Sequence, residues 1–231
     1  MAAPRFAGFG PGLAEFLVEL SQHNDRAWFE ANRDRYEANV REPARAFIRA
    51  MAPRLREVSA QLTADDRKVG GSLMRVHRDV RFSKDKTPYK TNLGVQFRHR
   101  LGKDVHAPGA YVHVGTDGVF LGMGMWRPDG PSLAEIRGAI DGDPRRWKRV
   151  SRARRLTEVW RPAGDSLKRA PKGYPADHPL IEDLRRKDFI LVRDLELRDV
   201  EGPEVVDLAI SSFARAKSYV RFLCDAIGVP F

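Results

Sequence analysis

The stretch AYVHVGTDGVFLGMGMW, Ala110–Trp126, decides the fold. On either side of Gly115–Gly118, apolar and polar residues alternate, and a period of two is the pattern of a half-buried β-strand. The link GTDG is rich in residues that accept a positive φ, which favours a tight hairpin. The stretch therefore predicts two antiparallel strands, Ala110–Gly115 and Val119–Trp126, joined by a short turn.

The same alternation continues on the N-terminal side of this hairpin. Ser72–Val80 and Leu93–His99 also alternate, and no stretch of helical period separates the four predicted strands. Parallel strands need a long crossover connection, whereas short strands that follow one another directly form an antiparallel meander. The sequence therefore predicts a four-stranded meander between residues 72 and 126.

Helical patterns flank the meander on both sides. LAEFLVEL, Leu13–Leu20, repeats apolar residues at helical spacing, and a similar pattern runs on to about Leu62. Leu133–Ile140 and the segment after Pro203 have the same period. The predicted fold is α+β, an antiparallel β-meander sheet packed against N-terminal and C-terminal helices. No composition break resembles a flexible linker, so we expect residues 1–231 to form a single domain.

Three features predict a cytoplasmic protein. Cys224 is the single cysteine, so no internal disulfide can form. The sequence contains no run of about 18 apolar residues, the length that indicates a membrane-spanning helix. The N-terminus, MAAPRFAGFGPGL, lacks the charged-then-apolar order of a signal peptide. We therefore expect no membrane association, and no motif indicates a cofactor or an oligomeric state.

The net charge of +10 is concentrated in two blocks. Arg67–Asp104 contains 11 basic and 3 acidic residues, a net charge of +8, and Arg145–Lys172 contains 11 basic and 2 acidic, a net charge of +9. Such blocks create positive fields that attract anions, phosphates among them. A nucleic-acid-associated protein that uses both blocks is one interpretation, although no helix-turn-helix, zinc-finger or RNA-recognition motif occurs.

Alternation also assigns side chains to the two faces of the predicted sheet. The apolar parity, which includes Met74, Val76 and Val95, is expected to face the core. In the last strand, either the two glycines or the two methionines of GMGM lie on the opposite, polar face. The loop RDVRFSKDKTPYKTN, Arg78–Asn92, is expected to form a rim over that face. The predicted ligand-binding residues are Arg75, His77, Asp79, Gln96, Arg98, Tyr111 and His113 on the face, with Arg81, Lys84, Lys86 and Lys90 at the rim.

These residue types suit anion binding and proton transfer. The leading hypothesis is a site for an anionic, phosphorylated small molecule. Because the same side chains serve binding and catalysis, the sequence leaves open whether the protein is an enzyme, and it assigns no catalytic residue. Metal binding is not expected, since no HxxxH or CxxC spacing occurs. The alternatives are a wet sheet face with a salt-bridged loop, and an interaction module without a small ligand.

Several long blocks of the sequence resemble one family. They are NDRAWFEANRDRYE, KVGGSLMRVHRDVRFSKDKTPYKTNLGVQFRH, GKDVHAPGAYVHV, FLGMGMWRPD and LKRAPKGYPADHPLIEDLRRKDF. From about Phe9 to about Phe222, the chain is similar to domain-of-unknown-function family 2461, which is found mainly in bacteria and also in fungi. The resemblance implies a single full-length domain and a cytoplasmic location. It implies no reaction, no cofactor and no catalytic residue.

Overall fold

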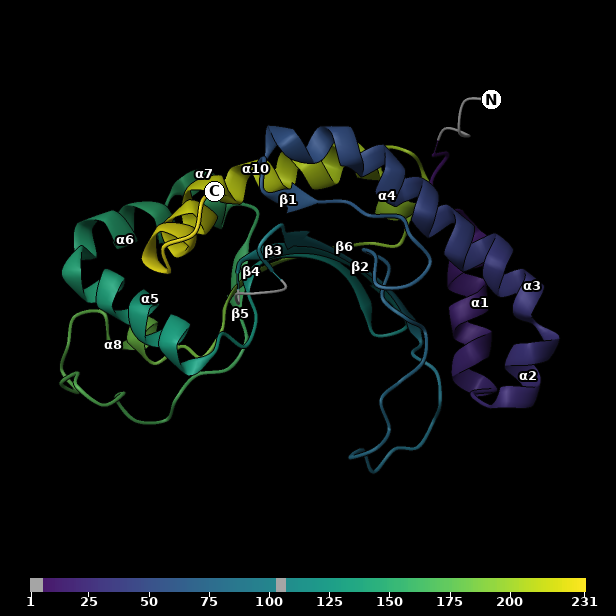
Figure 1. The fold of residues 1–231 in the computed structure, drawn as a ribbon, viewed down its shortest axis with the longest axis horizontal. Helices are drawn as coiled ribbons and strands as arrows, with labels where there is room; N and C mark the ends of the chain where they lie inside the picture. The colour runs from purple at the N-terminus through teal and green to yellow at the C-terminus, as the bar shows by residue number, and fades with distance from the viewer. Residues whose placement is uncertain (1–5, 103–106) are drawn as a thin grey trace.

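The computed structural model describes residues 6–102 and 107–231. Figure 1 shows a strongly curved sheet with helices along its convex side and an opposite, concave side that they leave open. The sheet has six strands in the order β1-β2-β3-β4-β6-β5, and every neighbouring pair is antiparallel. The α+β prediction is therefore confirmed. The strands are β1 (Leu62–Thr63), β2 (Asn92–His99), β3 (Gly109–Gly115), β4 (Gly118–Met125), β5 (Arg161–Ala163) and β6 (Phe189–Leu195).

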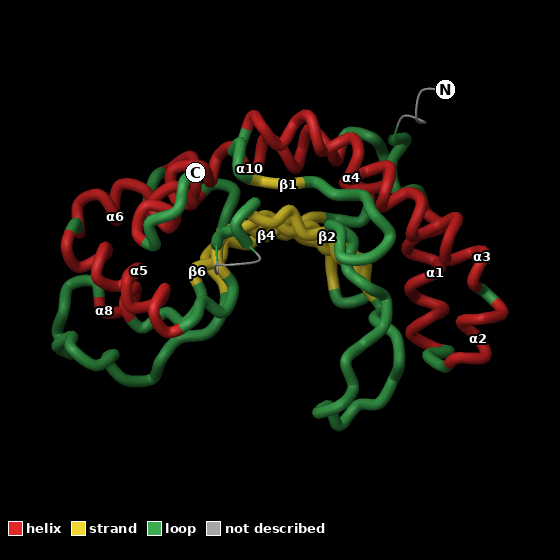
Figure 2. Tube along the Cα trace, viewed as in Figure 1, coloured by secondary structure: helices red, strands yellow, loops and turns green. Residues whose placement is uncertain are grey.

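The helices lie over the convex side of the sheet and at its two ends (Figure 2). Helices α1–α3 form one end, α5, α6 and α8 form the other, and α4 and α10 run between them. The N-terminal elements are α1 (Pro11–Gln22), α2 (Arg26–Ala31), α3 (Arg33–Tyr36), the π-helical turn η1 (Glu37–Arg41), α4 (Glu42–Arg54) and the 3-10 turn η2 (Leu55–Glu57). The later helices are α5 (Gly130–Gly142), α6 (Pro144–Ser151), α7 (Arg154–Thr157), α8 (Ile181–Leu184), α9 (Arg198–Glu201) and α10 (Val205–Ala226). In the described ranges, no helix has both the length and the apolar character needed to cross a bilayer.

The convex side of the sheet carries the core. Val95, Val112 and Leu121 lie opposite one another across β2, β3 and β4, and each is fully buried. Helix α4 covers this row with Phe47, whose ring centroid lies 6.2 Å from that of Phe97. Burying side chains of this size contributes about 1.5–3 kcal/mol each relative to leaving them exposed. The predicted apolar parity of Leu93–His99 and Ala110–Gly115 therefore faces the core as expected.

The predicted strand Ser72–Val80 is wrong. Only two isolated bridges form there, Leu73 to Val95 and His77 to Tyr89. From Leu73 to His77 the chain advances four residues, whereas their partners Val95 and Tyr89 are six residues apart. The two segments therefore cannot form a regular ladder of hydrogen bonds. The pairing also shifts the expected parity by one residue, because Leu73 rather than Met74 shares the core face with Val95, and Met74 is 38% exposed.

Residues 74–90, which we call the basic loop, project from the sheet beside α1–α3 (Figure 1). Asn24 fixes the base of this loop: its Nδ2 donates to the Tyr89 carbonyl, and its Oδ1 accepts from the Tyr89 N–H, both over 3.0 Å. The Tyr89 ring stacks on Phe29 of α2 with centroids 4.1 Å apart. Asp25 caps α2 by accepting from the Trp28 N–H, which leaves Asn24 free for the loop.

Replacing Asn24 with alanine should lower the free energy of unfolding by about 1–3 kcal/mol, because it leaves the part-buried N–H and C=O of Tyr89 without their partner. Urea denaturation followed by tryptophan fluorescence measures the change. Ser21→Ala is the matched control, since it removes one exposed, local bond to the Val18 carbonyl and should cost less than about 0.5 kcal/mol. Equal effects of the two substitutions would contradict the role of Asn24.

Candidate functional site on the concave face

The concave face collects polar side chains because of the register of the three central strands. Tyr111 lies opposite Gln96 of β2 and Gly122 of β4. Residues opposed across antiparallel strands project from the same side of the sheet. The glycines of GMGM therefore join the polar face, while the two methionines are buried on the convex side. Across the three strands this face carries Asn92, Gly94, Gln96, Arg98, Tyr111, His113, Phe120 and Gly122.

Tyr111, His113 and Asp117 form a chain of hydrogen bonds on this face. His113 Nε2 lies 2.9 Å from Asp117 Oδ1, and because a carboxylate only accepts, Nε2 carries the donated hydrogen. In the neutral ring Nδ1 is then an acceptor, and the Tyr111 hydroxyl donates to it over 3.2 Å. Phe120 stacks on the His113 ring with centroids 4.4 Å apart and planes 11° apart. Burial, with a contribution from Asp117, raises the pKa of Tyr111 to about 12, so its phenol is protonated at neutral pH.

Two glycines make room for this chain. A Cβ atom on Gly94 would lie 2.6 Å from the Tyr111 hydroxyl oxygen and 3.0 Å from Met74 Sδ. A Cβ atom on Gly115 would lie 2.7 Å from His113 Nε2, the atom that donates to the carboxylate. Such short contacts do not occur in a packed protein unless the neighbours move. The Tyr111 hydroxyl therefore lies directly over the β2 backbone, with the Met74 sulfur above the same glycine.

Lys90 is the basic-loop cation that shares the face of His113. The backbone N–H of Lys90 donates to the Val76 carbonyl over 2.8 Å, so Lys90 lies opposite Val76. Val76 is two residues after Met74, so by alternation the two project from the same side of the chain. Lys90 also has the parity of Asn92, the first residue of β2. The Asn92 amide nitrogen lies 3.5 Å from His113 Nδ1. The backbone thus places Lys90 in the row that continues through Asn92 toward the histidine.

Arg75 has the parity of Leu73 and not of Met74, so the prediction that it lies on the polar face is wrong. Its positive charge still acts on Lys90. Burial lowers the pKa of the half-buried Lys90, and the positive charge of Arg75 lowers it further. Neither side chain makes a hydrogen bond or an ion pair within the described residues. Arg75 has one attraction at longer range, because it contributes to the lowered pKa of Asp79.

Most other charges of the basic loop are neutralised within it. Arg81 donates to both carboxylate oxygens of Asp79, at 3.0 and 2.7 Å, and these bonds lower the pKa of Asp79 to about 2. Asp85 accepts from the backbone N–H of Thr87, from Arg78 and from the Thr87 hydroxyl, and its pKa also falls to about 2. The predicted face residue Asp79 and the predicted rim residue Arg81 thus bind each other.

Three further predicted residues lie away from the concave face or make no contact with it. His77 turns toward α2, with its ring centroid 5.2 Å from that of Tyr89 and 6.5 Å from that of Phe29. Lys86 Nζ donates to a carbonyl of its own loop over 2.9 Å. Lys84 is exposed and makes no bond within the described ranges. The structure therefore does not bring the rim lysines together at one point.

Gln96 and Arg98 do lie on the face, where Arg98 Nε donates to Gln96 Oε1 over 3.2 Å. Sequence reasoning missed Asp117 and Phe120. Asp117 was assigned only to the hairpin turn, although an acidic residue four positions after His113 was the available signal. Phe120 belongs to the strand whose face the alternation left open. Within the described ranges, no three His, Cys, Asp or Glu side chains cluster as metal ligands would.

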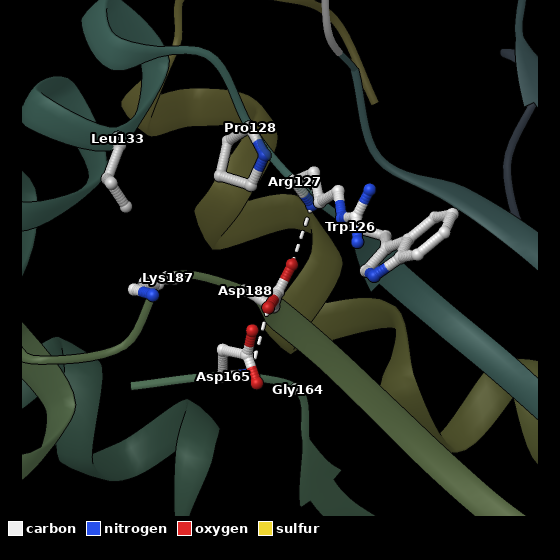
Figure 3. Close-up of a pocket in the computed structure, with 8 residues that line it drawn as sticks. All are labelled: Trp126, Arg127, Pro128, Leu133, Gly164, Asp165, Lys187 and Asp188. Carbon is white, nitrogen blue, oxygen red and sulfur yellow. Dashed lines mark hydrogen bonds between the residues drawn. The ribbon is translucent and has the colours of Figure 1, made fainter. Parts of the chain in front are cut away.

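A separate hollow of about 530 Å³ lies where β4 ends, beside the start of β6 (Figure 3). Its buried Asp188 accepts from the N–H groups of Arg127 and Asp165, over 2.7 and 2.8 Å. These bonds hold Arg127 at a φ of 50°, which is uncommon for a residue with a side chain. Trp126 is 66% exposed, and the Arg127 guanidinium lies 4.8 Å from its ring. Both oxygens of Asp188 bind backbone, so the carboxylate braces the chain segments that meet here.

Gly94→Ala should lower the free energy of unfolding by about 1–3 kcal/mol, because the new methyl group overlaps the Tyr111 hydroxyl. Adding Tyr111→Phe removes that oxygen and should restore part of the loss, which thermal and urea denaturation measure. Gly138→Ala in α5 is the control, since its Cβ meets nothing within 4 Å and alanine favours a helix by up to about 1 kcal/mol. A loss that is the same with tyrosine and with phenylalanine would contradict this packing.

Comparisons with known proteins matched one family model. No curated protein and no solved structure shows significant similarity to the chain. A family model described as conserved hypothetical protein (DUF2461) matches residues 13–222, which include the basic loop and the whole sheet. The chain therefore belongs to the DUF2461 family of conserved hypothetical proteins.

Proposed function

We propose that the protein binds an anionic, phosphorylated small molecule on its concave face. The observation that carries this proposal is the half-buried Lys90, whose amine has no bonded counter-ion in the described part of the chain and is acted on by the positive charge of Arg75. An anion beside them would relieve their repulsion, and Lys90 would gain most because it is half-buried and weakly solvated. Such a ligand fits the cytoplasmic location that the sequence predicts.

Neighbouring groups suit the oxygen atoms of such a ligand. The Asn92 amide makes only a long contact with His113, so it has donor capacity to spare. Arg98 lies six residues beyond Asn92 on β2, so its two terminal nitrogens, which are free because only its Nε bonds Gln96, would make a separate bidentate contact. Hydrogen bonds to charged groups contribute about 1.5–3 kcal/mol each, so each of these groups would add to the affinity.

Nucleic-acid binding is the alternative, and it has less support. Helix α6, which carries part of the second basic block, lies at the opposite end of the molecule from the basic loop (Figure 1). Several cations of that block also have acidic partners: Arg146 pairs with Asp225, and Arg152 pairs with Asp183. The net charge of the sequence therefore overstates the positive field available to a phosphate backbone. An interaction module without a small ligand remains the third alternative.

A thermal-shift screen of inorganic phosphate, sugar phosphates and nucleoside monophosphates, followed by calorimetry, tests the proposal. Lys90→Ala and Arg75→Ala should each lower the affinity for the tightest-binding anion about 10- to 100-fold, because each removes one positive charge that would attract it. The pKa of Lys90 is lowered, so the affinity should fall as the pH rises through a range where an ordinary lysine is still charged. Below that range the ammonium is intact and binding is strongest.

Two exposed cations provide matched controls. Lys84→Ala and Arg56→Ala each remove a charge that has no bonded partner in the described ranges, and each should change the affinity less than about twofold. If these control substitutions lowered the affinity as much as Lys90→Ala does, anion binding would depend on net charge alone and not on a defined site. Binding of DNA or RNA that is tighter than that of every small anion, and falls steeply with salt, would replace the proposal with the nucleic-acid alternative.

A further inference from the structure

The hollow beside Asp188 is a second candidate for a ligand site. We propose that it binds a nucleoside monophosphate, whose base stacks on the Trp126–Arg127 pair and whose phosphate contacts Lys187. The hollow has a volume of about 530 Å³, which lies within the range of about 300–1,000 Å³ that is typical of small-molecule sites. Its lining shares no residue with the anion site of the concave face, so the two sites are independent.

Uncommon backbone conformations shape both walls of the hollow. In the described ranges, Arg127 is the single residue other than glycine with a positive φ, and its N–H donates to the Asp188 carboxylate over 2.7 Å. On the other wall Gly164 has a φ of 94°, and a Cβ atom there would lie 2.4 Å from the Cβ of Asp188. The same carboxylate accepts from the Asp165 N–H over 2.8 Å, so one buried side chain fixes both walls. Strained conformations of this kind cluster at ligand sites.

Trp126 and Arg127 form a flat platform on one side of the hollow (Figure 3). The Arg127 guanidinium lies 4.8 Å from the ring centroid of Trp126, and Trp126 is still 66% exposed. The other three tryptophans of the chain are buried or half-buried. Nucleobases stack on aromatic rings and on guanidinium planes, and the platform offers both.

Charged groups on the rest of the lining suit the ribose and the phosphate. Lys187 lies on the other side of Asp188 from Trp126 (Figure 3), and its exposed amine makes no bond within the described residues. The carboxylate of Asp165, next to Asp188, is likewise without a bond in that part of the chain. An ammonium attracts a phosphate, whereas a carboxylate accepts hydrogen bonds from hydroxyl groups. The sequence of platform, acceptor and cation therefore matches the base, ribose and phosphate of a nucleotide.

Calorimetric titration of the full chain with adenosine monophosphate, ribose phosphate and adenosine tests the site. We expect adenosine monophosphate to bind at least about tenfold more tightly than ribose phosphate, which lacks the base, or adenosine, which lacks the phosphate. Binding should also protect the exposed ring of Trp126 from quenching by acrylamide. Equal affinities for adenosine monophosphate and ribose phosphate would overturn the nucleotide assignment.

Two substitutions test the two ends of the ligand separately. Trp126→Ala should abolish the advantage of adenosine monophosphate over ribose phosphate, and Lys187→Ala should abolish its advantage over adenosine. The matched controls lie outside the lining: Phe82→Ala removes an exposed ring beside Arg81, and Lys172→Ala removes an exposed cation without a bonded partner in the described ranges. Each control should change the affinity less than about twofold. Control losses as large as those of the two site variants would overturn the site.

Arg127→Gly separates binding from folding. Glycine accepts a positive φ and keeps the N–H that Asp188 binds. The thermal midpoint of the free protein should therefore stay the same or rise, while the affinity for adenosine monophosphate should fall about fivefold or more. Unchanged affinity would overturn the role of Arg127 in the platform.

Three further results decide where the nucleotide binds and in what form. Lys90→Ala should leave the affinity for adenosine monophosphate unchanged, and a loss there would move the nucleotide to the concave face and overturn the assignment of the hollow. Tighter binding of a short single-stranded RNA than of every mononucleotide would overturn the small-molecule ligand. The absence of binding by every nucleoside monophosphate at millimolar concentration would overturn the site.

Discussion

The fixed register of β2, β3 and β4 is the constraint on which the rest of the structure depends. Side chains along a strand alternate between the two faces, so the register that buries Val95, Val112 and Leu121 under α4 and α10 also places Tyr111 and His113 on the concave side. A slip of one residue would exchange the two sets and bury polar groups against the helices. Formation of the core and formation of the polar face are therefore a single event.

Polar side chains are stable on the concave face because most of them form hydrogen bonds or are exposed to solvent. His113 uses both ring nitrogens, one toward Tyr111 and one toward Asp117, and Gly94 leaves room for the hydroxyl. Buried polar groups that are satisfied in this way cost little, whereas an unpaired one is expensive. The amine of the half-buried Lys90 makes no bond within the described ranges.

Local sequence patterns predicted the three central strands. Contacts between residues far apart in the sequence determine the structure of Ser72–Val80, which those patterns do not reveal. Alternation and the GTDG turn placed β2, β3 and β4 within one or two residues of their ends, and put Tyr111 and His113 on one face. Ser72–Val80 alternates equally well, but its two bridges, to Val95 and to Tyr89, are offset from each other by two residues, and His77 turns toward Phe29 of α2. Neither effect is visible in the local sequence. The net charge of the loop was equally misleading, because two of its arginines bind two of its own aspartates.

The base of the basic loop holds the backbone of Lys90 in place. The preceding residue, Tyr89, is held by both hydrogen bonds of Asn24 and by the ring of Phe29, and the Lys90 N–H is held by the Val76 carbonyl. The backbone entropy of ordering this segment is therefore lost on folding. The loop tip neutralises its own arginines, while Arg75 and Lys90 keep their charges unpaired in the described structure. Basic residues without acidic partners would leave unpaired charge along the whole loop. Here two arginines of the loop are paired. The unbonded amine of Lys90 belongs to the base of the loop, next to the strand that carries Asn92.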